Sequence, residues 1–213
     1  MSEKNILITI TPNSVANVNR YLEITDKLIL ESAENYYIRG NNCRLSILGY
    51  NDVNEKEKLI NAINFYTKAI ELRTSYIDAW FWRGYAKRWL ADKKTTAANP
   101  AFIYLANYAD ALEDYNKVIE LDPNYAEAFS ARGDIKGFLQ DHAGAIEDCN
   151  KAIELNPNYV DAFCIRGTAK LRAKDYRGAI EDFEKAIELG ASDFFKDIWL
   201  KMAKEKLNEK TVK

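Results

Sequence analysis

The sequence repeats itself from Ala126 onward: AEAFSARGDIKGFLQDHAGAIEDCNKAIELNPNY (residues 126–159) is followed directly by VDAFCIRGTAKLRAKDYRGAIEDFEKAIELGASD (residues 160–193). The two stretches are each 34 residues long and align without a gap. Both contain Arg-Gly, Gly-Ala-Ile-Glu-Asp and Lys-Ala-Ile-Glu-Leu at the same offsets. Apolar residues recur every three to four positions, which is the spacing of a helix with one buried face. A repeat of this length and spacing predicts stacked pairs of helices.

Two earlier copies of the pattern appear when insertions are allowed. Residues 77–125 span 49 residues, which is 15 more than a 34-residue unit, and residues 33–76 span 44, which is 10 more. In both copies the extra residues fall between the two helices of the pair. Asn99-Pro100 predicts a helix from Pro100 to Leu121, and Asn54 predicts a similar helix start. The lengthened pairs could pack against each other or form a wall that contacts a ligand, and mutual packing is the simpler interpretation.

The repeated positions resemble the tetratricopeptide repeat (TPR) family. In chain order the shared positions are an aromatic residue (Tyr36, Trp80, Phe129, Phe163), a glycine (Gly40, Gly84, Gly133, Gly167), a small residue (Ala62, Ala111, Ala145, Ala179) and a second aromatic slot (Tyr66, Tyr115, Cys149, Phe183). The family's closing proline is present as Pro123 and Pro157 and is replaced in the other two copies. The resemblance implies an all-α, right-handed α-solenoid of about four helix-turn-helix units.

The resemblance also divides the chain. We expect an N-terminal arm and helix (residues 1–32), four repeats (33–76, 77–125, 126–159 and 160–193) and a C-terminal cap helix (194–213). Residues 1–12 read as a loose arm, in which Ile6 to Ile10 could equally form a short strand. The following helix carries Val15, Val18, Leu22 and Leu28, which could cover the first repeat.

Two positions depart from the family pattern. An arginine precedes the glycine in all four copies (Arg39, Arg83, Arg132, Arg166), and a lysine follows it by three residues in the last three copies (Lys87, Lys136, Lys170). Residues four apart lie on one face of a helix, so each arginine and lysine can reach the same acceptor. We expect the Glu-Asp pairs at 113–114, 147–148 and 181–182 to accept these cations as structural ion pairs. The first copy has Asn64-Phe65 at this place, so Arg39 is freer for a ligand in this interpretation.

In TPR proteins the first helices line a concave groove, and its positions can be assigned copy by copy. They are Glu34, Tyr37, Asn41, Arg44 and Leu45; Asp78, Phe81, Tyr85, Arg88 and Trp89; Glu127, Ser130, Asp134, Gly137 and Phe138; and Asp161, Cys164, Thr168, Leu171 and Arg172. Aromatic residues and arginine are frequent anchors of protein interfaces. The candidate binding residues are therefore Tyr37, Asn41, Arg44, Phe81, Tyr85, Arg88, Trp89, Asp134, Phe138 and Arg172. The groove could be open to a peptide or filled by the chain's own segments.

These features predict an interaction adaptor or scaffold, not an enzyme, that binds another protein or peptide. A structural subunit that self-associates is the alternative, and a reactive Cys164 is a remote third. His142 is the only histidine and the cysteines show no metal-ligand spacing, so we expect no cofactor and no metal. The places that hold Lys and Asn in chaperone-tail binders of the family match only at Asn41, so that clamp is not expected.

Charge and hydropathy narrow the possible partners and location. The chain has 30 basic and 32 acidic side chains and a formal net charge of -2. This balance predicts no nucleic-acid ligand, because phosphate binding needs a broad positive field. No stretch is long and apolar enough for a signal peptide or a membrane span, and the three cysteines form no disulfide framework. The expected location is the cytoplasm, with no membrane contact.

Overall fold

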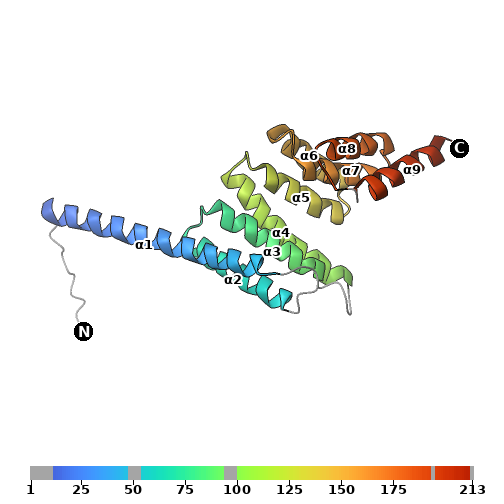
Figure 1. Cartoon of the computed structure of the whole chain (residues 1–213). Helices are drawn as coiled ribbons and strands as arrows, with labels where there is room; N and C mark the ends of the chain where they lie inside the picture. Colours follow the sequence, from blue (N-terminus) through green and yellow to red (C-terminus); the bar gives the residue numbers. More distant parts are fainter. Residues whose placement is uncertain (1–11, 48–53, 94–99, 193–194, 212–213) are drawn as a thin grey trace.

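The chain is helical throughout the part that the structure describes. This structure is a computed structural model, and it describes residues 12–47, 54–93, 100–192 and 195–211. Its helices are α1 (Pro12–Leu45), α2 (Glu55–Leu72), α3 (Ile77–Lys93), α4 (Pro100–Leu121), α5 (Ala126–Phe138), α6 (His142–Leu155), α7 (Val160–Arg172), α8 (Tyr176–Glu188) and α9 (Lys201–Thr211) (Figure 1). A short π-helix, Phe195–Leu200, leads directly into α9. None of the described residues forms a strand.

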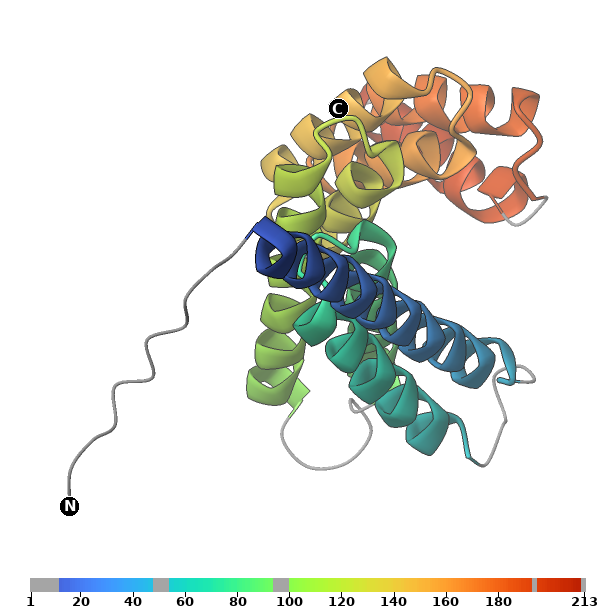
Figure 2. The same cartoon turned by 90° about the vertical axis from the view of Figure 1, so that its left-hand side faces the viewer.

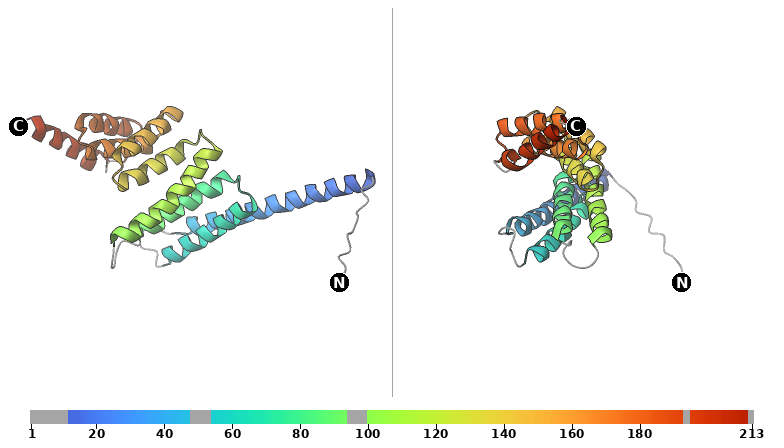
Figure 3. Two further views of the ribbon diagram at one scale, coloured as in Figure 1. Left: turned by 180° about the vertical axis from the view of Figure 1, so that it is seen from behind. Right: turned by 90° about the vertical axis from the view of Figure 1, so that its right-hand side faces the viewer.

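The helices pack as consecutive pairs. Helix α1 packs with α2, α3 with α4, α5 with α6 and α7 with α8, and each pair contacts the next through its second helix. The pairs form a bent stack (Figure 2), with α1 at one end and α9 at the other (Figure 3). The prediction of an all-α solenoid of helical pairs is confirmed.

Helix α1 differs from the expected arrangement at the N-terminus. It is one helix of 34 residues that combines the expected N-terminal helix with the first helix of the first repeat. The physical reason is the absence of any proline or glycine between Pro12 and Gly40, so nothing stops the helix. Its N-terminal half extends beyond the stacked pairs (Figure 1), and Leu28 is 58% exposed. The prediction that Leu28 covers the first repeat is therefore wrong. Residues 1–11, with the expected arm or strand, lie outside the described residues, as do the side chains of Val15, Val18 and Leu22.

The first two pairs are longer than the last two, as the sequence predicted. Helix α4 runs from Pro100 to Leu121, which are the predicted bounds, whereas the equivalent α6 and α8 have 14 and 13 residues. Helix α2 begins at Glu55, directly after Asn54. Helix α3 packs against both α2 and α4, so the lengthened pairs contact one another. The side chains of residues 101–107 lie outside the described part.

Small residues let the two helices of each pair approach closely. The four equivalent alanines, Ala62, Ala111, Ala145 and Ala179, are all fully buried. A Cβ atom added at Gly167 would lie 2.6 Å from Cε1 of Phe183, the residue in the second aromatic slot. Gly40 and Tyr66 have the same relationship in the first pair. Glycine stands at this position because the close approach of the two helices leaves no room for a side chain.

The predicted ion pairs form inside the last three repeats, and the aspartate of each Glu-Asp pair is the acceptor. Arg132 donates from Nε and Nη2 to both carboxylate oxygens of Asp148 at 2.9 and 2.6 Å, and Lys136 Nζ lies 2.8 Å from Asp148 Oδ2. The aspartate side chain is only 4% exposed. The same geometry recurs at Asp114 and Asp182, so three buried carboxylates each hold two cations. The bidentate contact is the strongest arrangement that an arginine and a carboxylate can form.

Each of these arginines also joins its repeat to the one before. The remaining nitrogen, Nη1, donates to Asn116 from Arg132, to Asn150 from Arg166, and to Thr67 from Arg83, at 2.7 to 3.2 Å. In the first copy, Arg39 lies over the ring of Phe65 at 4.2 Å from its centroid. The phenylalanine thus stands where the other copies have the carboxylate, and the exposed Arg39 makes a cation-π contact with it in place of an ion pair.

The C-terminal segment covers the last repeat, as predicted. Trp199, Leu200 and the fully buried Ala203 pack against the apolar cluster around Phe183. Lys204 of α9 pairs with Glu184 of α8 at 2.9 Å. This segment therefore covers apolar area that another repeat would otherwise bury.

Candidate peptide-binding groove

The first helices of the last three repeats line two adjoining hollows. The first hollow is lined by Phe81, Tyr85, Arg88, Tyr115, Glu127, Ser130, Ala131, Asp134, Tyr159, Asp161, Cys164 and Ile165. The second is lined by Asp134, Gly137, Phe138, Cys164, Ile165, Thr168, Ala169, Arg172 and Trp199. The two share Asp134, Cys164 and Ile165, so they adjoin each other across α3, α5 and α7, and together we call them the groove.

The structure places six of the ten candidate residues at the groove: Phe81, Tyr85, Arg88, Asp134, Phe138 and Arg172. Arg88 and Asp134 form an ion pair that connects α3 to α5, with the arginine head group over the ring of Phe138. Arg88 is therefore held by the protein itself, and its positive charge is balanced by a carboxylate beside it.

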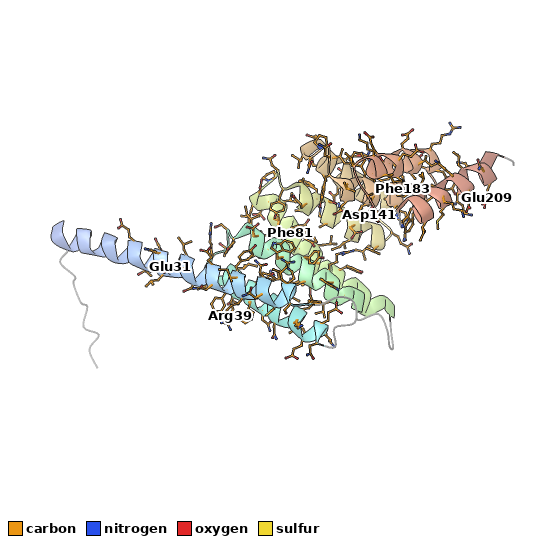
Figure 4. All side chains as sticks on the ribbon, in the orientation of Figure 1. Glu31, Arg39, Phe81, Asp141, Phe183 and Glu209 are labelled. Carbon is orange, nitrogen blue, oxygen red and sulfur yellow. The ribbon has the colours of Figure 1, made fainter. Side chains whose placement is uncertain are left out.

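The aromatic residues contribute less exposed surface than the sequence suggested. Phe81 is 8% exposed and packs between Trp82, Tyr115 and Tyr125 in the centre of the stack (Figure 4). Trp89 packs against an apolar cluster between α2 and α3 and does not line either hollow. Phe81 is therefore a core residue, whereas Tyr37, Tyr85 and Trp89 are half-buried. Phe138, at 39%, is the most exposed of these rings.

The three candidates on α1 lie apart from the groove. Tyr37 packs against Tyr76 with ring centroids 4.9 Å apart. The Oδ1 atom of Asn41 accepts hydrogen bonds from Tyr66 and from Arg44. Arg44 lies over the ring of Trp82 at 3.8 Å from its centroid. These side chains hold α1 against α2 and α3, so the first repeat adds no lining residue to either hollow.

Several lining residues were not among the ten candidates. Glu127, Ser130, Asp161, Cys164 and Thr168 occupy groove positions of the repeat pattern, and that pattern is the signal that finds them. Leu171, at another such position, is instead buried in the core under the cap. Tyr115, on a second helix, Tyr159, just before α7, and Trp199, in the C-terminal segment, could be placed only by the tertiary structure.

Tyr115 and Tyr66 occupy the same repeat position but differ in their hydrogen bonding. The hydroxyl of Tyr66 donates to Asn41 Oδ1 at 2.8 Å. The residue equivalent to Asn41 in the next repeat is Tyr85, which offers no such amide oxygen. The hydroxyl of Tyr115 is buried and has no hydrogen-bond partner among the described residues. Burial raises the pKa of Tyr115 far above its usual range, so it is a neutral hydrogen-bond donor.

Cys164 has the properties of a packing residue, in agreement with the sequence interpretation. It is 5% exposed, and burial raises the pKa of its thiol to about 12. A nucleophilic cysteine needs a lowered pKa, because the thiolate is the reactive form. His142 is the first residue of α6, away from both hollows. The described residues contain no group of three or more His, Cys, Asp or Glu side chains placed to hold a metal ion.

No helix within the described ranges has the length and apolar character needed to cross a bilayer. The fold and the groove together define a class of protein: a solenoid of helical pairs whose first helices line a shared depression.

Comparison with known families identifies the repeats. Residues 101–137 match a profile described as TPR repeat, and residues 126–159 and 160–192 each match one described as tetratricopeptide repeat. The chain contains tetratricopeptide repeats over residues 101–192, and the family resemblance drawn from its motifs is confirmed. Domains of this kind are protein-interaction modules. A search of curated protein sequences found no match.

Solved structures show the same architecture. The TPR domain of Sgt2 from Aspergillus fumigatus is 27% identical, with a TM-score of 0.53 over 64% of this chain and 82% of that domain. MamA from Desulfovibrio magneticus RS-1 is 17% identical, with a TM-score of 0.59 over 84% of this chain and 92% of MamA. The first TPR domain of human RPAP3 is 24% identical, with a TM-score of 0.50 over 60% of this chain and 94% of that domain. At 17% and 24% identity, the last two similarities concern the fold alone.

Proposed function

We propose that this chain is an interaction adaptor that holds a segment of another protein in the groove. The observation that carries the proposal is that two adjoining hollows lie across three successive repeats. A run of linked hollows along a solenoid suits an extended peptide, which can place one side chain in each. The hollow nearest the C-terminus has a volume of about 200 Å³, which is enough room for one side chain of a bound peptide.

The chemistry of the lining supports binding more than catalysis. The groove combines partly buried apolar groups with charged ones, and its cysteine is a neutral thiol. Apolar groups with a few polar side chains among them are the usual composition of an interface centre. The three cysteines are free, which supports a reducing compartment such as the cytoplasm.

A selection from a random decapeptide display library, with the full-length chain as immobilised bait, tests the proposal. The variant Ile165→Arg places a long charged side chain where the two hollows meet, whereas Glu181→Arg changes an exposed residue of α8 outside the groove. We expect wild type and Glu181→Arg to enrich the same peptides and Ile165→Arg to lose them, with unchanged helical circular dichroism. Enrichment that survives in Ile165→Arg would place the binding surface elsewhere.

A self-associating subunit is the second candidate. It is favoured by the exposed apolar side chains of α1, where Leu28, Leu30 and Leu45 are 58%, 47% and 66% exposed. Light scattering coupled to size exclusion, over a range of protein concentrations, gives the mass directly. A mass of 24.4 kDa at every concentration would exclude self-association in that range.

A further inference from the structure

The charges that line the first hollow do not balance. Its lining contains one cation, Arg88, and three carboxylates, those of Glu127, Asp134 and Asp161. Arg88 is paired with Asp134. Glu127 and Asp161 are exposed, and neither forms an ion pair with another described residue. The hollow therefore has an excess of two negative charges that the surrounding helices do not neutralise.

Aromatic rings stand beside these carboxylates. Tyr85, Tyr159 and Phe81 line the same hollow. The face of an aromatic ring attracts a cation, most strongly when the cation is partly shielded from water. Carboxylates and aromatic rings in one hollow thus favour binding of the same kind of group, a lysine or arginine side chain with a long apolar stem.

The hydroxyl of Tyr115 gives a second, independent reason to expect a ligand in this hollow. It is a buried donor that no described residue satisfies, and a buried polar group normally has a hydrogen-bond partner. Tyr115 lines the same hollow, and its aromatic neighbours there are Phe81 and Tyr85. In the preceding repeat, the equivalent Tyr66 hydroxyl donates to the amide oxygen of Asn41 at 2.8 Å. The chain thus shows which group satisfies a phenol at this position: an amide oxygen.

We infer that the groove binds a basic peptide segment, with a lysine or arginine side chain against Glu127 and Asp161 and a backbone amide oxygen accepting from the Tyr115 hydroxyl. The inference rests on the proposed function and specifies the chemistry of the ligand. A backbone carbonyl of the peptide takes the place that the Asn41 amide occupies in the first repeat. An acidic segment is disfavoured, because it would bring like charges together in a partly shielded site.

The library selection on the full-length chain distinguishes a failure of this inference from a failure of the proposed function. We expect the enriched decapeptides to be rich in lysine and arginine and poor in aspartate and glutamate. Enrichment of acidic or uncharged peptides that Ile165→Arg abolishes would overturn the inference and leave the groove as the binding site. Failure to enrich any peptide that depends on the groove would overturn both.

Affinities of one enriched basic peptide, measured by fluorescence anisotropy at low salt, test the named residues. The double variant Glu127→Gln/Asp161→Asn removes the two groove charges, and the matched control Glu147→Gln/Glu181→Gln removes two exposed charges from α6 and α8. We expect the groove variant to lose affinity about tenfold and to lose most of its salt dependence. The control should change less than about twofold. Equal effects of the two variants would refute specific recognition by the groove carboxylates.

Tyr115→Phe tests the hydrogen bond, since it removes only the hydroxyl and no described contact depends on that atom. We expect an unchanged melting temperature and about fivefold weaker binding of the same peptide. Unchanged affinity would overturn the assignment of this hydroxyl to the ligand.

Discussion

Loss of the buried carboxylate at Asp148 should destabilise the protein far more than loss of an exposed one. Asp148 accepts two hydrogen bonds from Arg132 and pairs with Lys136, all within 2.6 to 2.9 Å. The substitution Asp148→Asn keeps the shape of the side chain but removes its charge. The two cations, whose side chains are 19% and 25% exposed, then remain largely buried without a counter-charge.

The expected cost follows from this burial. Removing one partner of a buried ion pair typically costs about 3–5 kcal/mol, chiefly because the other charge stays buried alone. The partial exposure of both cations favours the lower end, about 3 kcal/mol. The matched control is Glu154→Gln, because Glu154 pairs with Lys151 at 2.8 Å but is 69% exposed. Exposed pairs contribute about 0–1 kcal/mol, so the control should lose less than about 0.5 kcal/mol.

Urea unfolding followed by circular dichroism at 222 nm measures both losses. A third variant, with Leu at 148 and Met at both 132 and 136, replaces the whole group by apolar side chains. It should recover most of the lost free energy, because no buried charge is left unpaired. If Asp148→Asn loses less than about 1 kcal/mol, or no more than Glu154→Gln, the buried network is not a source of stability and the reasoning fails.

Three further changes test other features of the stack. Gly167→Ala should lower the free energy of unfolding by about 1–3 kcal/mol, since the new Cβ would lie 2.6 Å from the ring of Phe183. The matched change Gly137→Ala meets its nearest neighbour at 3.8 Å and should stabilise the protein by up to about 1 kcal/mol. Thermal melting compares the two variants. Lys174→Gly should stabilise by about 0.5 kcal/mol or more, because Lys174 has a φ of 66° that glycine adopts without strain; a lower melting temperature would contradict this. Cys164 should resist iodoacetamide in the folded protein at pH 8, because its raised pKa of about 12 keeps the thiol neutral, and it should react once the protein is unfolded. Mass spectrometry measures the labelling. Rapid labelling of the native state would support the hypothesis of a reactive thiol.

The ionisation of the buried thiols also has a consequence for stability. Burial raises the pKa of Cys164 and Cys149 from about 9 to about 12 in the folded chain. The unfolded chain therefore loses these protons first, and the free energy of unfolding should fall as the pH rises above about 9. Substitution of both cysteines by alanine, compared in urea melts at pH 7 and pH 10, should reduce this pH dependence.

The repeat and its internal packing could be predicted from the sequence because both depend on local spacing. The 34-residue period, the glycine and alanine at fixed offsets and the Arg-Lys pair four residues apart all lie within one repeat. In a helix, residues three or four positions apart lie on the same face, so the sequence pattern predicted the ion-pair acceptors Asp114, Asp148 and Asp182. The pattern also predicted that α4 begins at Pro100.

The candidate site was predicted less well, because it depends on contacts between repeats. The pattern placed Phe81, Trp89 and Arg88 on the groove side, but it could not show how much of each its neighbours cover. Arg88 is held by Asp134 of the next repeat, and that pairing depends on the distance between α3 and α5.

By itself, the sequence determined that this protein is a stack of helical pairs and which residues pack inside each pair, because periodicity acts over a few turns of helix. Which buried polar groups have a hydrogen-bond partner depends instead on how whole helices pack. Tyr66 and Tyr115 occupy one repeat position, yet Asn41 satisfies the first hydroxyl and no described residue satisfies the second. The reason is that a hydrogen bond requires two atoms from distant parts of the chain to meet within about 3 Å, and only the packing of whole helices sets that distance.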